Sequence, residues 1–277
     1  MEDRIDRLTG LLQRFGLRAR VLHGGVLRGV LQIERRTGLG HLHVLRQGAI
    51  ELTDGDGQVH RLSGPSAVFF PKAGSYRVVA GEEGAEVLCA AIDFGLGDEN
   101  PLLGSLPPMM CVPVAELPFL DATLGVLFAE ASARRCGHST VLDRLTEVLF
   151  VQLMRCAIER RLVEGGVVAG LADVRLFRAL TAMHDDPARN WSLVSLAATA
   201  GMSRSRFAAR FTAVVGVPAM EYLTRWRIGV ARGLLRRGRP PKAVAQEVGY
   251  GRSSTFGRAF THVVGATPTS WLRSMDG

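Results

Sequence analysis

The chain has 277 residues, 47% of them hydrophobic, which is enough for two domains with ordinary cores and argues against a largely disordered protein. An uncharged apolar run of about 18 residues is absent, and the segment MEDRIDRLTG at the start is charged, so we expect neither a membrane span nor a signal peptide and predict a cytoplasmic protein. The net charge of +8 is uneven: from Leu171 onward there are 16 Lys or Arg and 6 Asp or Glu, against 18 and 20 before it. Such a concentrated basic surplus suits a phosphate backbone.

The first part of the chain, residues 21–92, has the pattern of a β-rich domain. Short apolar segments such as HLHVLRQGAIEL and EVLCAAI alternate with turn sequences such as TDGDGQ and GEEGAE. Strands at this close spacing predict a small β-sandwich or barrel. The next segment, residues 93–113, is rich in glycine and contains paired prolines, so we expect irregular structure there.

Helical periodicity begins after Pro118. Residues 141–162 are expected to form a helix with one apolar stripe, made of Leu142, Leu145, Val148, Leu149, Leu153 and Cys156. This stripe needs a partner, which is either the β-rich domain or the same helix of a second subunit. The sequence GGVVAG at residues 165–170 then has the composition of a hinge, and the rest of the chain is expected to be helical.

The C-terminal part contains one pattern twice, about 49 positions apart, at residues 196–216 and 244–265. Each copy has a glycine (Gly201, Gly249), then two phenylalanines at i and i+4, and a closing glycine. A helix, a turn at a glycine that adopts positive φ, and a second anchored helix make a helix-turn-helix. Residues 220–238 are expected to form the helix that connects the two units. Two such units at a fixed separation can place helices in successive major-groove segments of one DNA duplex.

The exposed positions of the second helix in each unit are the predicted DNA contacts. An arginine there can bond O6 and N7 of guanine together, whereas other arginines only hold phosphate. Ser203 is also expected to cap its helix by accepting a backbone hydrogen bond. The candidates are Ser203, Arg204, Ser205, Arg206 and Arg210 in the first unit and Arg252, Ser253, Thr255 and Arg258 in the second. The alternative is a helical repeat that binds acidic proteins, which would show no preference among DNA sequences.

At these residues the chain resembles the AraC/XylS family of bacterial transcription regulators. The signature of the family's second unit stands here as GYGRSSTFGRAFTHVVGATP, with Gly249, Tyr250, Ser254, Phe256, Arg258, Phe260, Gly265 and Pro268. Arg252 departs from the pattern, because the family usually has an acidic residue there. The resemblance implies a nucleoid-associated regulator whose partners are double-stranded promoter DNA, RNA polymerase and, in some members, a second copy of the chain.

The first 165 residues resemble the cupin-like sensor domain of one branch of that family, through HLHVLRQGAIEL, VFFPKAG, NPLLGSLPPMM and RLTEVLFVQLMR. The resemblance implies an α+β protein with a cupin-like β-barrel or sandwich, a helical dimerisation segment and an all-α domain with two helix-turn-helix units. The expected boundaries are 1–105 for the sensor, 106–165 for the linker and dimerisation helices, and 171–277 for the DNA-binding domain. A small-molecule or oxidant effector at the sensor is expected to change how the other domain engages promoters.

The metal-binding pattern of cupin enzymes is incomplete in this chain. Such enzymes hold a metal with His-x-His, a following Glu and a later His. His41 and His43 supply the first pair, on one face of a strand. Gln47 or Gly48 stands where Glu is expected, and Tyr76 or Arg77 stands in place of the later His. Two ligands are too few for a catalytic metal centre, so we expect no catalytic metal, no cofactor and no enzymatic activity.

Three interpretations of His41, His43 and Cys89 remain open on the sequence: packing side chains, a metal or redox sensor, or contacts to an organic effector. A redox role requires that Cys89 be partly exposed and have thiolate character. The four cysteines lack CxxC spacing, which argues against a zinc finger. The competing class of function is a cupin-type metal enzyme with an accessory DNA-binding domain.

Overall fold

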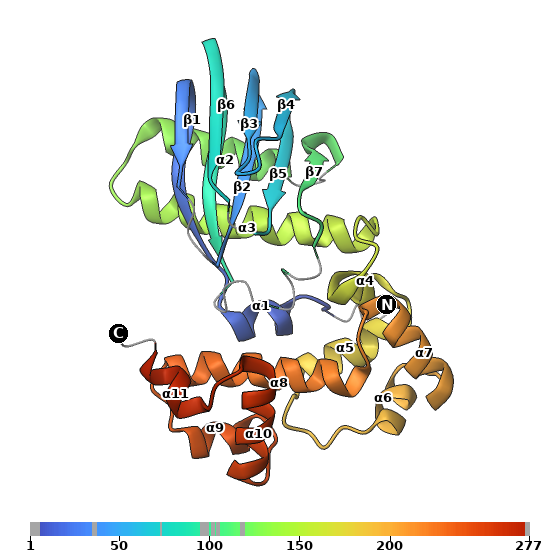
Figure 1. The fold of residues 1–277 in the computed structure, drawn as a ribbon. Helices are drawn as coiled ribbons and strands as arrows, with labels where there is room; N and C mark the ends of the chain where they lie inside the picture. Colours follow the sequence, from blue (N-terminus) through green and yellow to red (C-terminus); the bar gives the residue numbers. More distant parts are fainter. Residues whose placement is uncertain are drawn as a thin grey trace. The chain divides into compact units, whose positions relative to one another are not determined.

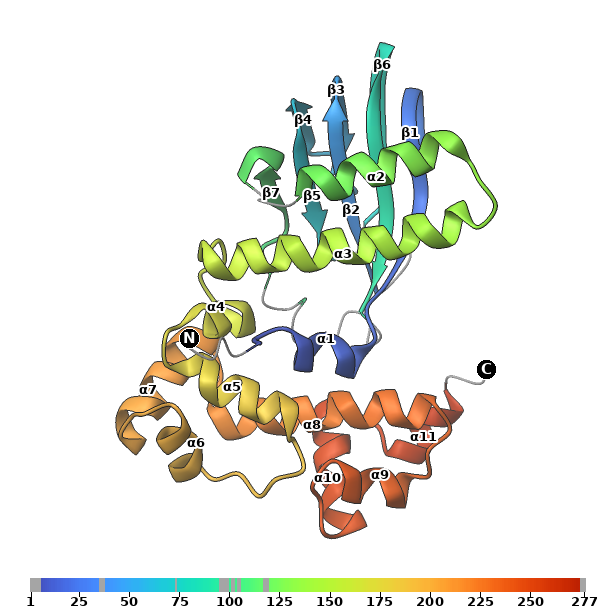
Figure 2. The ribbon, with the colours of Figure 1, turned by 180° about the vertical axis from the view of Figure 1, so that it is seen from behind.

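The computed structural model describes residues 6–34, 38–72, 74–94, 100, 103, 106–116 and 120–274. The chain divides into two compact units (Figures 1 and 2). The sheet unit spans Leu17–Asp98 and Leu106–Leu162, and the helical unit comprises Met1–Gly16, Glu99–Ser105 and Val163–Gly277. No helix in the described ranges is both long and apolar enough to cross a membrane.

The sheet unit is built on one antiparallel sheet. Its strands are β1 (Arg18–Ile33), β2 (Leu39–Gln47), β3 (Ala49–Thr53), β4 (Val59–Ser63), β5 (Ser66–Phe70), β6 (Tyr76–Asp93) and β7 (Met110–Pro113). They lie in the order β4-β3-β6-β2-β5-β7, with β1 paired along β6. The early part of β6 pairs with β3 and the later part with β2, so the sheet curls into a half-barrel. This confirms the α+β, cupin-like fold.

One expectation for this region is wrong. Met110–Pro113 belongs to the segment predicted to be irregular, yet it forms β7, in which Met110 is the partner of Phe69 on β5. Pairing with an existing strand edge outweighs the local signal of the two preceding prolines, because backbone groups at an edge are satisfied by any strand of the right register.

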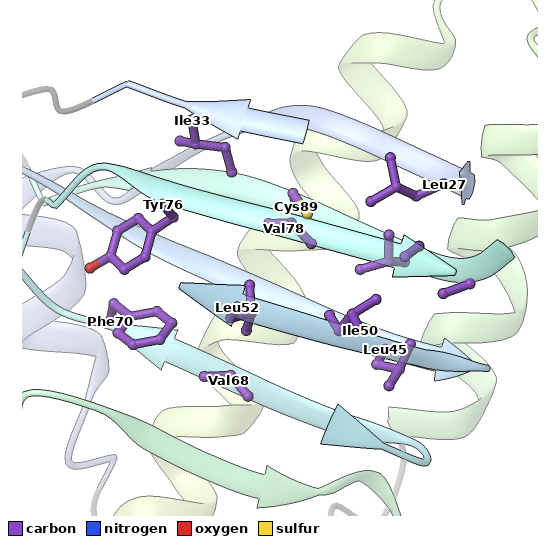
Figure 3. Packing of buried hydrophobic residues seen from close by; sticks show 13 residues of the cluster. Leu27, Ile33, Leu45, Ile50, Leu52, Val68, Phe70, Tyr76, Val78 and Cys89 are labelled. Carbon is purple, nitrogen blue, oxygen red and sulfur yellow. The ribbon is translucent and has the colours of Figure 1, made fainter. Parts of the chain in front are cut away.

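The inner face of the half-barrel is a closely packed apolar cluster (Figure 3). Alternate residues of each strand point into it, as the period of two in a strand requires. Among the side chains drawn are Leu27, Ile33, Leu45, Ile50, Leu52, Val68, Phe70, Tyr76, Val78 and Cys89.

The outer face of the sheet is covered by α2 (Leu120–Ala133) and α3 (His138–Glu159), which follow the short turn η3 (Val114–Glu116). Phe150 of α3 lies edge-on to Phe69 and Phe94, with ring centroids 5.0 and 5.2 Å away. The predicted stripe on α3 is buried at Leu142, Leu149, Leu153 and Cys156, while Val148 stays exposed. The β-rich domain is therefore the partner of most of the stripe.

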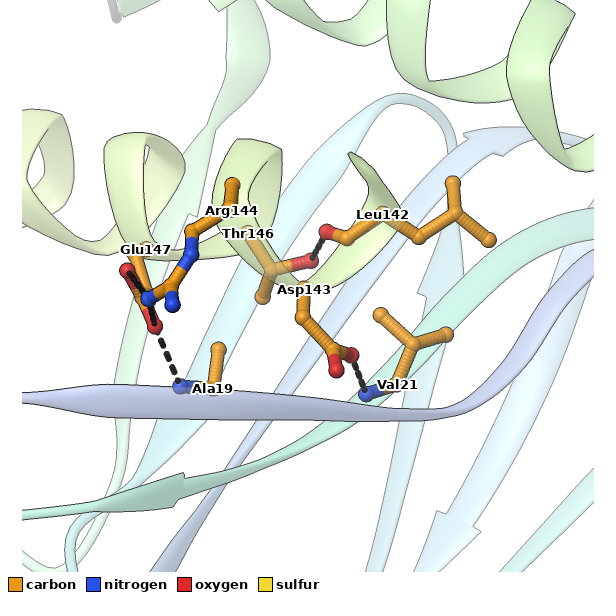
Figure 4. Close-up of polar contacts among 7 residues, drawn as sticks. All are labelled: Ala19, Val21, Leu142, Asp143, Arg144, Thr146 and Glu147. Atoms are coloured by element: carbon orange, nitrogen blue, oxygen red, sulfur yellow. Dashed lines mark hydrogen bonds and ion pairs between the residues drawn. The ribbon is translucent and has the colours of Figure 1, made fainter. Parts of the chain in front are cut away.

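Polar side chains also join α3 to the sheet (Figure 4). The backbone N–H of Val21 donates to Oδ1 of Asp143 at 2.7 Å, and the N–H of Ala19 donates to Oε1 of Glu147 at 3.3 Å. Arg144 holds the Glu147 carboxylate at 2.9 Å. Two backbone donors of β1 are thus satisfied by helix carboxylates, which is one way a protein protects a strand edge.

The helical unit contains α1 (Thr9–Phe15) and the helices after α3. These are α4 (Gly166–Ala172), α5 (Leu176–Asp185), α6 (Leu193–Thr199), α7 (Arg204–Val215), α8 (Ala219–Arg236), α9 (Pro241–Glu247), α10 (Ser253–Val264) and α11 (Pro268–Arg273). The segment 165–170, expected to be a hinge, forms most of α4 instead. Val167, Val168 and Leu171 are buried and α4 contacts α7, so tertiary packing outweighs the low helix propensity of glycine.

The first helix packs with this unit, although the expected boundaries group it with the sensor. Leu8 and Leu11 are buried, and α1 contacts α5 and α8. Arg7 donates to the carbonyl of Leu171 at 3.2 Å, and its guanidinium lies 4.2 Å from the centroid of the Phe177 ring. Residues far apart in the sequence thus complete one helical core.

Candidate nucleic-acid interface

The two repeated segments fold into equivalent helix-turn-helix units, α6–α7 and α9–α10. In the first turn the N–H of Met202 donates to the carbonyl of Ala197 at 2.9 Å, and in the second the N–H of Tyr250 donates to that of Ala245 at 2.8 Å. Gly201 and Gly249 both have positive φ, at 63° and 86°. Most side chains avoid this backbone conformation, so glycine is required at both turns.

The two phenylalanines anchor each second helix in the same way. The ring centroids of Phe207 and Phe211 are 5.5 Å apart, and those of Phe256 and Phe260 are 5.6 Å apart. All four side chains are buried. Because residues four apart share one side of a helix, the opposite sides of α7 and α10 are left to solvent. We call α7 and α10 the recognition helices.

All nine predicted DNA contacts are exposed residues of α7, α10 or their N-caps: Ser203, Arg204, Ser205, Arg206, Arg210, Arg252, Ser253, Thr255 and Arg258. Within the described ranges, the guanidinium groups of four of them form no hydrogen bond, ion pair or cation–π contact: those of Arg204, Arg206, Arg252 and Arg258. Each recognition helix, with its N-cap residue, therefore presents two exposed guanidinium groups that have no intramolecular contact among the described residues. We call these arginines uncommitted.

Arg210 differs from the other four arginines because it has an intramolecular partner. Its Nε donates to Oδ2 of the buried Asp173 at 2.8 Å. The other carboxylate oxygen of Asp173 accepts from the N–H groups of Arg175 and Leu176 at the start of α5. Burial alone would raise the pKa of Asp173, but the hydrogen bonds from Arg210 and these N–H groups lower it. Arg210 thus attaches α7 to the start of α5.

The N-termini of the recognition helices are uncapped. Ser203 occupies the N-cap of α7, but its hydroxyl makes no hydrogen bond to the first turn, contrary to expectation; α10 begins at Arg252 without a side-chain cap. In contrast, Ser192 and Ser195 form a capping box on α6, and Thr267 caps α11. Uncapped N–H groups at a helix N-terminus are good ligands for phosphate. The two uncapped termini with exposed arginines match what a DNA backbone needs.

The sensor candidates His41 and His43 lie on the inner face of the half-barrel, where both side chains are 1% exposed or less. None of their four ring nitrogens has a hydrogen-bond partner among the described residues. Burial lowers the pKa of His41 to about 4, and burial together with His41 lowers the pKa of His43 to about 3. Both imidazoles are therefore neutral near pH 7. An unpaired buried polar group is costly, so this pair is unusual for a purely structural cluster.

Cys89 is the strand partner of His43 and is fully buried. Burial raises the pKa of its thiol to about 12. Neither condition for a reactive thiol is met, and Cys89 behaves as a small apolar residue of the inner cluster. In the described part of the chain, no three His, Cys, Asp or Glu side chains are grouped as metal ligands.

A cleft of about 630 Å³ opens beside His41 within the sheet unit. Apolar residues of β1 and β2, including Leu22, Leu31 and Leu39, line it together with charged side chains such as Arg20 and Asp143. His41 belongs to the packed inner face and also lines this cleft, whose volume is large enough for a small molecule.

The contacts of two residues that shape the interface were not predicted from the sequence. Asp173 holds Arg210 from 37 positions away, and Arg227 on α8 bonds a loop 38 to 40 positions away. Sequence separation hides both pairs. The only signal was that each is a charged residue within an otherwise apolar helical pattern, which is weak because such residues are usually exposed.

A curled antiparallel sheet joined in one chain to two equivalent helix-turn-helix units defines a class of protein with a half-barrel domain and a double helix-turn-helix domain. Comparison with known proteins supports this class. Residues 6–159 match the family described as Cupin, and residues 196–274 match the family described as Helix-turn-helix domain. The chain belongs to the AraC family of transcription regulators, in the branch with an N-terminal cupin domain.

Two sequence relatives are named as transcription regulators. A putative AraC-like transcription regulator of Streptomyces lividans is 40% identical over 185 residues, which are 65% of this chain and 60% of that protein. An uncharacterized HTH-type transcriptional regulator of Haemophilus influenzae is 27% identical over 99% of both chains. The chain thus spans about 60% of the length of the Streptomyces relative. The structure was also compared with that of unsaturated-fatty-acid-bound ToxT from Vibrio cholerae. The two chains are 14% identical in sequence, the superposition covers 92% of this chain and 94% of the ToxT chain, and the TM-score is 0.40.

Proposed function

We propose that the chain binds promoter DNA sequence-specifically and regulates transcription in response to a signal at the sheet unit. The observation that carries the proposal is the pair of equivalent recognition helices, each with two uncommitted arginines and an uncapped N-terminus. They are joined by α8, whose 18 residues span about 27 Å.

The exposed residues divide into two proposed roles. Arg204, Arg206 and Arg252 are placed early enough in their helices to reach base edges, where a recognition helix contacts DNA. Ser203, Ser205, Ser253, Thr255 and Arg258 are proposed to contact bases or phosphates from the same faces. Arg210 acts through its ion pair with Asp173, which orients α7 and leaves only part of its guanidinium for a phosphate.

The proposal is tested by selecting genomic fragments of the source organism on the full-length protein, followed by footprinting. We expect recovery of promoters that contain two short sequence blocks about one helical turn apart. Recovery of no preferred sequence at about 0.15 M salt, with or without extracts that contain small molecules, would reduce the interaction to nonspecific electrostatic binding and overturn the proposal.

We further propose that the signal is a small molecule that enters the cleft beside His41. The unpaired ring nitrogens of His41 supply a donor and an acceptor beside the apolar residues of the cleft, which suits an organic ligand with a polar group. The burial and high pKa of Cys89 argue against direct sensing of an oxidant at that thiol. A metabolite library screened by thermal shift tests this: hits that stabilise wild type and not His41→Ala support the site. Metal that copurifies at one per chain and is lost in His41→Ala would identify a metal sensor instead.

We propose that the sheet unit senses and does not catalyse. The cupin-enzyme alternative requires a third and fourth metal ligand, and the described residues group no three such side chains. Stoichiometric metal together with turnover of any small substrate would establish the enzyme alternative. Binding to acidic proteins with no preference among DNA sequences would establish the adaptor alternative.

Two more partners are proposed for the full protein. A second copy of the chain is expected to pack on the outer side of α3, where Val141 and Val148 are exposed seven positions apart on one helix face. Sedimentation of wild type and Val148→Glu tests this, and a concentration-independent monomer in both would remove the dimer. RNA polymerase is the expected partner in activation, and transcription reconstituted on a selected promoter would test that contact.

A further inference from the structure

The two helix-turn-helix units meet at a contact that we call the inter-unit seam. It consists of the loop at residues 186–190 before α6, Arg227 in the middle of α8, and the turn Gly249–Tyr250 before α10. Its parts come from three separate segments of the chain. The seam therefore links the first unit, the connecting helix and the second unit at one place.

Arg227 is the centre of the seam. Its Nε donates to the carbonyl of Pro187 at 2.7 Å, and its Nη2 donates to the carbonyl of Arg189 at 2.9 Å. Its guanidinium carbon lies 5.6 Å from the centroid of the Tyr250 ring. Burial lowers the pKa of Arg227, an effect that the nearby Tyr250 and Asp186 oppose. A guanidinium that contacts two backbone carbonyls and one aromatic ring holds these three groups in a fixed orientation.

Gly249 brings the second unit directly against the loop. A Cβ at this position would lie 2.6 Å from the carbonyl oxygen and 2.9 Å from the Cα of Ala188. Both are backbone atoms, which cannot move aside as the end of a long side chain can. The equivalent Gly201 has the same left-handed backbone, but a Cβ there would meet no atom within 4 Å. The close approach is thus specific to the second turn.

One side of the seam is attached to α6, which packs against the recognition helix α7, and the other side is attached to the recognition helix α10. Trp191 donates from Nε1 to the carbonyl of Asp186 at 2.8 Å, and it directly precedes the capping box of α6. On the other side, the Tyr250 ring lies 5.7 Å from that of Phe256, a buried anchor of α10. A displacement of the seam would therefore be transmitted to α10 relative to α7.

We propose that Arg227, together with the close approach at Gly249, is the positioning device that fixes the spacing of the two DNA blocks this protein recognises. The proposal rests on the proposed function, because it concerns how two recognition helices engage one duplex. One base pair of spacing changes the distance by 3.4 Å and the direction by about 35°. Only a rigid seam can discriminate between spacings that differ by one base pair. Arg227 itself does not touch DNA in this role.

The test uses a library in which the two selected blocks are kept and the number of base pairs between them varies. We expect wild type to prefer one spacing over its neighbours by about tenfold, which corresponds to 1.4 kcal/mol. Arg227→Met, which keeps the aliphatic stem and removes the donors, is expected to reduce that ratio to about threefold or less while base preferences within each block are unchanged. Arg225→Met is the matched control, because Arg225 is exposed on the same helix and its one ion-pair partner among the described residues is Glu221.

A second pair of variants tests the seam independently of how well Arg227→Met folds. Gly249→Ala and Gly201→Ala introduce the same backbone strain at equivalent turns, but only the first presses on Ala188. We expect Gly249→Ala to shift or broaden the preferred spacing and Gly201→Ala to leave it as in wild type.

The outcomes separate this proposal from the proposed function. If wild type selects no pair of blocks, the proposed function fails. If wild type selects two blocks at one spacing and both Arg227→Met and Gly249→Ala keep its spacing ratio, the proposed function stands and the positioning role of the seam is overturned. If Arg225→Met or Gly201→Ala broadens the spacing as much as its counterpart, the specific role of the seam is also overturned.

Discussion

Arg206 is the residue whose chemistry most directly connects this structure to sequence recognition. It lies in the first turn of α7, is exposed, and has no intramolecular partner in the described part of the chain. A bidentate arginine contact to guanine contributes about 1–3 kcal/mol of discrimination. We expect Arg206→Ala to weaken binding to the selected site by roughly that amount and to relax base preference at one position. Fluorescence anisotropy with single-base variants of the site measures both effects.

Nonspecific DNA of the same length supplies the control for this measurement. A base contact predicts a large loss on the selected site and a small loss on nonspecific DNA. An equal loss on every sequence would reassign Arg206 to the phosphate backbone.

The buried His43 predicts a pH dependence of stability. Its pKa is about 3 in the folded protein, against 6.5 when exposed, so the unfolded chain binds more protons as the pH falls. Stability is complete above pH 6.5 and is lost as the pH drops from 6.5 toward 3. Between pH 7 and pH 5 the free energy of unfolding should fall by about 2 kcal/mol for this residue.

Among the described neighbours of His43, His41 adds to this effect. Its pKa is about 4 in the folded protein and 6.5 when exposed, so it contributes a similar loss of stability over the same range. Tyr76 and Cys89, whose pKa values are raised to about 12, stay neutral throughout. Urea unfolding followed by circular dichroism at both pH values checks the prediction, and His43→Leu is expected to lose that share of the pH dependence. Tryptophan fluorescence follows the helical unit separately, because all three tryptophans lie after residue 190. An unchanged pH profile in His43→Leu would contradict the assignment.

Among the helices, the supporting helix α6 and the recognition helix α7 differ in their N-terminal capping. Ser192 bonds the first turn of α6, whereas Ser203 leaves the first turn of α7 without a cap. We expect Ser192→Ala to lower the free energy of unfolding by about 1 kcal/mol. Ser203→Ala is expected to leave unfolding unchanged and to weaken DNA binding by about 0.5–1.5 kcal/mol, the value of one lost hydrogen bond. Thermal unfolding and DNA titration of both variants check these two predictions. Equal effects of Ser192→Ala and Ser203→Ala on the free energy of unfolding would contradict them.

Elements set by local signals were predictable from the sequence. The turn glycines Gly201 and Gly249 and the phenylalanine pairs fix each unit within about 20 residues of chain, and the repeat makes the signal unambiguous. The alternation of apolar residues on β2 likewise predicted that His41 and His43 share a face, and the structure places both on the inner face of the sheet. Period and turn chemistry carry this information because they depend only on neighbours in the sequence.

Elements set by distant partners were not predictable. The glycines of α4 indicated a hinge, and only packing against α7 explains its helix. Leu11 looks like any apolar residue until its contacts in the helical unit are known. Arg210 matches a DNA contact by position, yet Asp173 already holds it. In each case a single sequence does not record which segment supplies the partner.

In the complete chain, the excess of basic residues is confined to the part that contains the two helix-turn-helix units. The basic surplus lies after Leu171, and the preceding residues are close to neutral. The proposed attraction to DNA therefore belongs to the helical unit, and we expect the sheet unit to respond to its signal without a competing charge. Binding should then depend on salt through the phosphate contacts of α7 and α10 alone, since each neutralised phosphate releases counterions.

Arg258 gives the sharpest test of this separation. It is exposed on the middle of α10 without an intramolecular partner in the described ranges, where a phosphate contact is expected. Removing one phosphate contact changes the slope of log K against log salt by about 0.9. We expect Arg258→Gln to reduce the slope by that amount and to weaken binding to all sequences alike, as measured by titrations between 0.05 and about 0.3 M KCl. Arg273→Gln removes the same charge from α11, which is not a recognition helix, and should leave the slope unchanged. If both variants lower the slope equally, the attraction is a property of net charge, and the recognition helices have no special share in it.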